Sequence, residues 1–109
     1  MNIDKETQEK IHELQSFEQN IQSLLIQKQA FQMELSETEN ALSEIIKTKD
    51  DVYKMIGNIM IKTSKENIKK ELEQKKELLL LRLKSIENQE EKISKKADEL
   101  REEVMKKIN

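Results

Sequence analysis

The chain lacks cysteine, proline and tryptophan, and its 109 residues include a single glycine. Without cysteine it can form neither disulfide bonds nor thiolate metal sites, which suits a reducing compartment. Aromatic residues make up only 3% of the sequence. A compact core of this size normally uses more aromatic and branched side chains, together with several turn residues. These absences argue against a small globular domain.

Long apolar runs are missing as well. The longest is the leucine run at residues 78–81, far short of the roughly 20 residues of a membrane-spanning helix, and the first residues contain no signal-peptide core. The formal net charge of −2 gives no electrostatic case for nucleic acid or an anionic membrane. We therefore expect a soluble, cytoplasmic protein that binds neither nucleic acid nor membrane.

The sequence is rich in charged residues, at 39%, and in apolar residues spaced by alternating steps of three and four. This heptad pattern is typical of a coiled coil, and its regularity argues against disorder. It predicts helices at residues 5–48 and 64–108. The first seam is Leu14, Phe17, Ile21, Leu24, Lys28, Phe31, Leu35, Thr38, Leu42 and Ile45, flanked by Ile11, Leu25 and Ile46. The second seam is Leu72, Lys76, Leu79, Leu83, Ile86, Glu90, Ile93, Ala97, Leu100 and Val104.

The two seams match each other when the helices are placed antiparallel. If facing residue numbers sum to 114, nine consecutive pairs stay in phase, from Leu42 and Leu72 to Leu14 and Leu100. This favours a helical hairpin within one chain, with both termini at the same end. Four polar residues interrupt the seams: Lys28, Thr38, Lys76 and Glu90. They could fix the register, but reaching toward solvent along their stems is the preferred interpretation.

Residues 49–63 are predicted to form a linker and a β-hairpin. Two apolar runs flank Gly57-Asn58, a dipeptide suited to a two-residue turn. With Ile56 opposite Ile59, both faces of the hairpin are largely apolar, and such a hairpin is marginal alone and prone to pair at its edges. We therefore expect hairpins of several chains to join in an intersubunit sheet or barrel. The expected assembly residues are Val52, Tyr53, Met55, Ile56, Ile59, Met60 and Ile61.

The start of the second helix carries a capping signal. Thr63 is predicted to be the N-cap residue, and Glu66, three residues later, completes a capping box.

Three stretches resemble a known family, the archaeal prefoldin beta subunits, and the resemblance extends over the whole chain. They are Gln27-Lys28-Gln29, the hairpin sequence VYKMIGNIMIK at residues 52–62, and ELEQKKEL at residues 71–78. The resemblance implies a single prefoldin-type subunit over residues 1–109, in a hexamer of two alpha and four beta subunits whose hairpins form β-barrels. It further implies an ATP-independent chaperone that captures non-native polypeptides at its coiled-coil tips and passes them to a group II chaperonin.

A chaperone of this design needs apolar side chains that are only partly covered at the helix ends. The expected client-binding set is Ile3, Ile11, Leu14, Val104, Met105 and Ile108, in which the flexible Met105 suits varied contacts. For Leu14, as for Phe17 and Leu100, packing within the seam is the preferred role. The alternative function is a structural or tethering subunit whose helices dock folded partners.

Catalytic motifs are missing from the sequence. It has no nucleotide-binding loop, no metal-ligand cluster and no nucleophile–base pair, and His12 is the only histidine. The many carboxylates are best explained as a solvated helix surface. The sequence therefore predicts a protein that is not an enzyme and that uses no metal and no cofactor.

Overall fold

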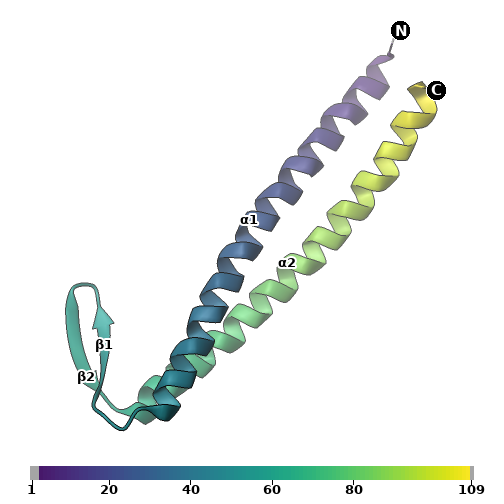
Figure 1. Ribbon diagram of the computed structural model, residues 1–109. Helices are drawn as coiled ribbons and strands as arrows, with labels where there is room; N and C mark the ends of the chain where they lie inside the picture. Colours follow the sequence, from purple (N-terminus) through teal and green to yellow (C-terminus); the bar gives the residue numbers. More distant parts are fainter. Residues whose placement is uncertain (1–2, 109) are drawn as a thin grey trace. The chain divides into compact units, whose positions relative to one another are not determined.

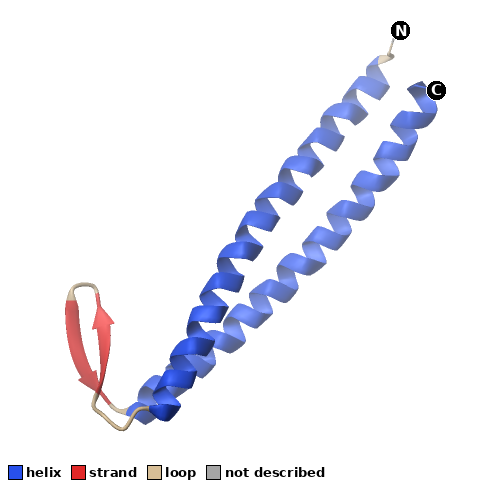
Figure 2. Cartoon of the chain, viewed as in Figure 1, coloured by secondary structure: helices blue, strands red, loops and turns tan. Residues whose placement is uncertain are grey.

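A computed structural model describes residues 3–108 of the chain. The elements follow in the order α1 (Lys5–Lys47), β1 (Val52–Ile56), β2 (Ile59–Thr63) and α2 (Lys65–Ile108) (Figures 1 and 2). The predicted fold class, two long helices with one antiparallel β-hairpin between them, is confirmed. The observed helices differ by one residue from the predicted ranges 5–48 and 64–108.

The chain is divided into two units. One contains the residues up to 29 together with those from 84 onward, and the other contains residues 30–83. We call them the terminal unit and the hairpin unit. Both α1 and α2 pass through both units, and within each unit they run antiparallel and pack against each other (Figure 1).

The helix interface of each unit is built from the predicted seams. Every seam residue is buried or half-buried. The buried seam residues are Leu24, Ile86, Ala97 and Val104 in the terminal unit, and Thr38, Leu79 and Leu83 in the hairpin unit. The flanking Leu25 and Ile46, by contrast, are exposed. The heptad pattern therefore identified the buried face of both helices.

Polar seam residues are accommodated inside the interface. The Thr38 hydroxyl is buried and donates a hydrogen bond to the carbonyl oxygen of Glu34 at 2.8 Å. Lys28 Nζ lies 3.5 Å from Glu90 Oε1, and each of these side chains is 25% exposed. Glu90 Oε1 is sealed from solvent and accepts no hydrogen bond from the described residues, so the Lys28 ammonium is its charge partner. The prediction that the polar seam residues reach toward solvent is wrong for Thr38, which is buried, whereas Lys28 and Glu90 are partly exposed and pair with each other.

The N-terminus of each helix is capped by a side chain. The Asp4 carboxylate accepts a 2.7 Å hydrogen bond from the backbone N–H of Thr7, and the Ser64 hydroxyl accepts one of 3.1 Å from that of Asn67. The prediction of Thr63 as N-cap is therefore wrong by one residue. Strand pairing continues to Thr63, opposite Val52, and holds it in β2.

The β-hairpin has the register that the sequence predicted. Ile56 lies opposite Ile59, Met55 opposite Met60, and Tyr53 opposite Lys62. Gly57 has a φ of 59°, and no other described residue has a positive φ. This is the pattern of a type II′ turn, in which only the first central residue needs the left-handed region.

Candidate assembly and client-binding surfaces

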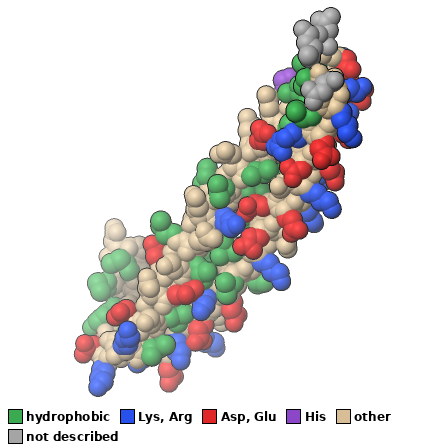
Figure 3. Space-filling view, turned by 45° about the vertical axis from the view of Figure 1, so that its right-hand side comes forward, with side chains coloured by type: hydrophobic (Ala, Val, Ile, Leu, Met, Phe, Trp, Pro, Cys, Tyr) green, Lys and Arg blue, Asp and Glu red, His purple; other side chains and the backbone are tan. Residues whose placement is uncertain are grey.

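The β-hairpin leaves most of its apolar side chains exposed. Six of them are 45–68% exposed: Tyr53, Met55, Ile56, Ile59, Met60 and Ile61. Only Val52 of the predicted assembly residues is half-buried. On the face that Figure 3 shows, apolar side chains lie at the hairpin, and along the helices they are interspersed with charged ones. Because fully burying one such side chain contributes roughly 1.5–3 kcal/mol, there is a strong drive to cover this surface.

One lysine joins the hairpin to α2, and a second joins the start of α2 to the end of α1. Lys54 Nζ of β1 lies 2.9 Å from a carboxylate oxygen of Glu71 on α2. Lys65 Nζ donates hydrogen bonds to the carbonyl oxygens of Ile46, at 3.2 Å, and Thr48, at 3.1 Å. Lys65 thus satisfies carbonyl groups at the C-terminal end of α1, where a positive charge is favoured.

A groove of about 620 Å³ separates β1 from the two helices. Its apolar floor is formed by Ala41 and Ile45 of α1 with Ile68 and Leu72 of α2, and residues 53–55 of β1 form its wall. No residue of β2 lines this groove. The outer edge of β1 therefore faces the helices, and that of β2 faces away from them.

The predicted client-binding residues lie near the start of α1 and the end of α2, with unequal exposure. Met105 is 53% exposed and Ile3 36%. Ile11, Leu14 and Ile108 are half-buried, and Val104 is only 6% exposed. Met105 lines a hollow of about 530 Å³ together with four charged residues, Asp98, Arg101, Glu102 and Lys106. Met105 and Ile3 are thus open to a client in this conformation, whereas contact with Val104 requires the helices to separate.

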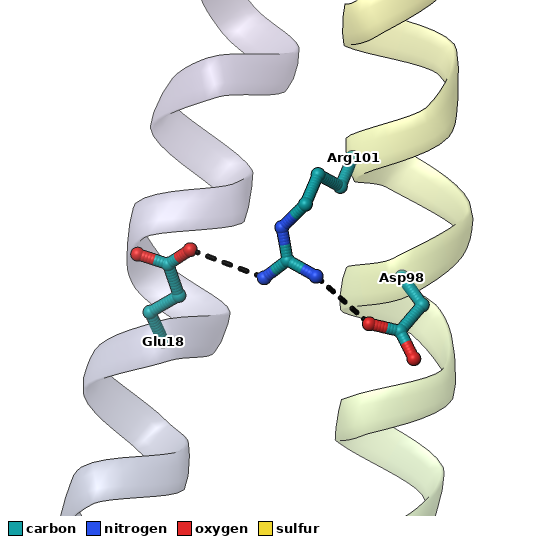
Figure 4. Close-up of polar contacts among 3 residues, drawn as sticks. All are labelled: Glu18, Asp98 and Arg101. Carbon is teal, nitrogen blue, oxygen red and sulfur yellow. Dashed lines mark hydrogen bonds and ion pairs between the residues drawn. The ribbon is translucent and has the colours of Figure 1, made fainter.

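Ionic contacts join the helices in the terminal unit. The Arg101 guanidinium bridges Asp98 of its own helix, at 2.8 Å, and Glu18 of α1, at 3.4 Å (Figure 4). Nearer the helix ends, Lys10 Nζ lies 3.2 Å from a carboxylate oxygen of Glu103. These pairs help to fix how α1 and α2 meet in this unit.

Two ionisable groups near the helix ends have shifted pKa values. Hydrogen bonding to Thr7 lowers the pKa of Asp4, and hydrogen bonding to Glu103 raises the pKa of Lys10. The folded chain therefore favours the charged form of each group. The contribution of Asp4 to folding stability is lost as the pH falls through its lowered pKa, and that of Lys10 is lost as the pH rises through its raised pKa. Both contributions are in place at neutral pH.

Sequence reasoning did not find the contacts of Lys54 and Lys65. A basic residue that follows a β-hairpin and reaches back to the C-terminus of the preceding helix could have suggested Lys65. The pairing of Lys54 with Glu71 has no local signal, because it depends on how the hairpin is placed over the helices.

Within residues 3–108, no group of three or more His, Asp or Glu side chains is placed to hold a metal ion. Nor does the described chain include a helix that is both long and apolar enough to cross a membrane.

Antiparallel helices joined through an exposed, apolar β-hairpin define a class of coiled-coil protein with a small sheet at the bend between its helices. Comparison with known proteins agrees. A family model described as "Prefoldin subunit" matches residues 8–109. The prefoldin subunit beta of Pyrococcus furiosus is 39% identical over 105 residues, which cover 94% of this chain and 90% of that relative. That of Thermococcus kodakarensis is 41% identical over 101 residues, covering 91% and 86%.

A crystal structure with the same fold is also similar in sequence. The prefoldin beta subunit from Thermococcus strain KS-1 superposes with a TM-score of 0.88 at 36% sequence identity, and the match covers 96% of this chain and 94% of that one. The chain therefore belongs to the prefoldin subunit family, and its resemblance to archaeal beta subunits is confirmed. Membership implies a chaperone-type function and a place in a hetero-oligomeric prefoldin assembly; the family is not a known family of enzymes.

Proposed function

We propose that this chain is a subunit of a cytoplasmic, ATP-independent holdase. It captures non-native polypeptides at the ends of its helices and delivers them to a group II chaperonin. The observation that supports this most directly is Met105, a flexible apolar side chain that is 53% exposed near the end of α2 in a chain of a chaperone family.

The proposed assembly is a hexamer of two alpha and four beta subunits, joined through their hairpins in β-barrels. Its support is the exposed apolar surface of residues 52–61, which an isolated two-stranded hairpin cannot cover. Subunits that share this surface each keep their own helix ends for clients.

Weak individual contacts are consistent with a protein that accepts many clients. Burying one partly covered apolar side chain contributes about 1–2 kcal/mol, so a single helix end binds poorly. Several ends presented together on one assembly raise the overall affinity, because every contact after the first is intramolecular. A holdase of this kind therefore needs its oligomer.

Replacing Met105 by Ser tests the proposal at the helix end. Met33→Ser is the matched control, because Met33 is 67% exposed on α1 in the hairpin unit. We expect Met105→Ser to raise severalfold the concentration of assembly that half-suppresses aggregation of guanidine-denatured citrate synthase, since about 1 kcal/mol is lost at each helix end. The control should match the wild type.

Removing residues 1–10 and 100–109 is the stronger version of this test. The shortened chain is expected to assemble with unchanged stoichiometry and to lose suppression of aggregation. A shortened assembly that suppresses aggregation as well as the wild type would contradict the holdase. Loss of one defined, folded partner with suppression unchanged would favour the tethering subunit instead.

A further inference from the structure

We infer that Leu78 and Leu81, on the outer face of α2, form a second client-contact site within the hairpin unit, and that this site takes an extended apolar segment of a non-native polypeptide. The inference rests on the proposed holdase function. It adds a site on the side of a helix to the one proposed at the helix ends.

The leucine run makes α2 apolar on every side over one turn. Residues 78–81 are four consecutive leucines, and successive residues of an α-helix lie about 100° apart, so the run surrounds the helix. Leu79 lies in the seam and is 2% exposed, whereas Leu78, Leu80 and Leu81 are 47%, 47% and 67% exposed. A helix that packs against one partner needs a single apolar face. Packing against α1 therefore explains Leu79 but not the others.

Leu78 and Leu81 share the face of α2 that points away from α1. They are three residues apart, so their Cβ atoms are neighbours about 5–6 Å apart on the helix surface. One heptad before and after Leu81, the same face carries Gln74 and Asn88, which are polar and exposed. The two leucines thus form a short apolar patch on an otherwise polar helix surface.

The size of this patch indicates what kind of partner it fits. A leucine side chain offers roughly 100 Å² of apolar surface, so all three exposed leucines together offer about 300 Å² at most. A stable interface between folded proteins buries about 800 Å² on each partner. The patch is therefore too small to hold a neighbouring subunit or a folded protein. It suits a short segment that binds weakly, which a non-native client supplies.

The spacing of the two leucines favours an extended segment. Residues two apart in an extended chain lie on the same side, about 7 Å from each other, which is close to the separation of Leu78 and Leu81. A segment with alternating apolar residues can therefore contact both at once. Glu77 and Arg82 lie beside the patch with opposite charges, and the Arg82 guanidinium is 5.6 Å from the centre of the Phe31 ring. The patch thus does not select clients by net charge.

This contact acts together with those at the helix ends. Once a client is held there, its binding to Leu78 and Leu81 is intramolecular and strengthens capture. Two leucines alone hold a client too weakly to suppress its aggregation. Loss of suppression on removal of residues 1–10 and 100–109 is therefore consistent with a second site.

Photo-crosslinking in the complete assembly tests the site directly. The probe is p-benzoylphenylalanine in place of Leu81, and the client is acid-denatured green fluorescent protein, whose barrel strands supply alternating apolar segments. We expect at least tenfold more crosslinked client than with the probe in place of Gln74 or Asn88, the exposed positions one heptad away. Native green fluorescent protein should not be crosslinked.

Three results of this experiment would overturn the inference. Equal crosslinking from all three positions would show that the leucines form no site. Crosslinking of position 81 to another subunit in the absence of client would make the patch a subunit interface. Crosslinking of native green fluorescent protein would show that the patch docks folded proteins.

The double variant Leu78→Gln with Leu81→Gln tests whether the contact matters for capture. Glutamine has nearly the helix propensity of leucine, so α2 is retained. We expect the concentration of assembly that half-suppresses refolding of acid-denatured green fluorescent protein to rise at least fivefold. Met33→Gln is the matched control, because Met33 is 67% exposed on α1 in the same unit. The control should change this concentration less than twofold.

An unchanged half-suppressing concentration in the double variant would overturn the second site and leave capture at the helix ends standing, which Met105→Ser tests separately. A wild-type assembly that does not suppress refolding of this client at all would overturn the proposed holdase and the second site together.

Discussion

Among single residues, Lys28 and Glu90 form the polar layer that departs most from an ordinary apolar helix interface. Each side chain is 25% exposed, and the two charges are 3.5 Å apart. An ion pair with this much solvent contact contributes only about 0–1 kcal/mol. Leucines at the same two seam positions would bury apolar surface worth roughly 1.5–3 kcal/mol each. The main effect of this polar layer is therefore to fix the register of the two helices, and not to stabilise the fold.

Replacing both residues by leucine is expected to raise the free energy of unfolding by about 1–3 kcal/mol, because apolar packing replaces a partly solvated ion pair of little net stability. Either single change should give less than half of this gain, since one charge is left without its partner. Urea unfolding, followed by far-UV circular dichroism at equal chain concentrations, measures the difference.

The matched control is the Glu34–Lys75 pair, which also crosses the helix interface, at 3.2 Å, but is 42% and 49% exposed. Its replacement by two leucines should shift the free energy of unfolding by less than the Lys28 and Glu90 change. A double variant at Lys28 and Glu90 that is less stable than the wild type would show that the ion pair stabilises the interface after all.

At the scale of the elements, the start of α2 shows how closely two neighbouring capping residues can compete. Thr63 and Ser64 are both good N-cap residues. Strand pairing makes Ser64 the N-cap, because Thr63 pairs with Val52 in the sheet. The hydroxyl of Ser64 accepts the hydrogen bond from the N–H of Asn67.

Ser64→Ala is accordingly expected to lower the free energy of unfolding by about 1 kcal/mol, the usual cost of a lost N-cap. Thr63→Ala should cost less than half as much. Amide exchange at Asn67 separates the two effects, because it should accelerate only in the Ser64 variant. Faster exchange at Asn67 in Thr63→Ala alone would restore Thr63 as the cap.

Most of this fold could be predicted from local patterns. The heptad steps identified the buried face of both helices, and Gly57-Asn58 set the strand register, because a two-residue turn fixes which residues lie opposite each other. The placement of the hairpin over the helices could not be predicted. It involves the Lys54–Glu71 ion pair, and the helix ends beside the hairpin are joined by Lys65; these contacts link residues 17 or more positions apart.

The candidate surfaces were predictable in composition and only partly in exposure. The hairpin residues were correctly identified as an apolar surface. At the helix ends, the heptad phase places position 104 in the seam and position 105 beside it, and Val104 is buried whereas Met105 is exposed. Val104 was included in the client-binding set despite its seam position, because side chains at the helix ends were expected to be only partly covered.

At the scale of the whole molecule, the proposed function requires two surfaces with different roles. Apolar residues of β1 and β2 are exposed in the single chain and are proposed to be buried between subunits. Apolar residues near the helix ends are proposed to stay accessible to clients. If the hairpin did not drive assembly, several helix ends could not act on one client, and each would bind too weakly to hold it.

The most direct test is the native mass of this chain expressed together with the prefoldin alpha subunit of its own organism, for the wild type and for Ile56→Asp with Ile59→Asp. We predict that the wild type gives a hexamer with four copies of this 12.9 kDa chain and two of the alpha subunit. The double variant should keep its far-UV helical signal and remain unassembled, because a carboxylate cannot be buried without a partner. A wild-type chain that stays monomeric beside its alpha subunit, or a double variant that still forms the hexamer, would contradict the account.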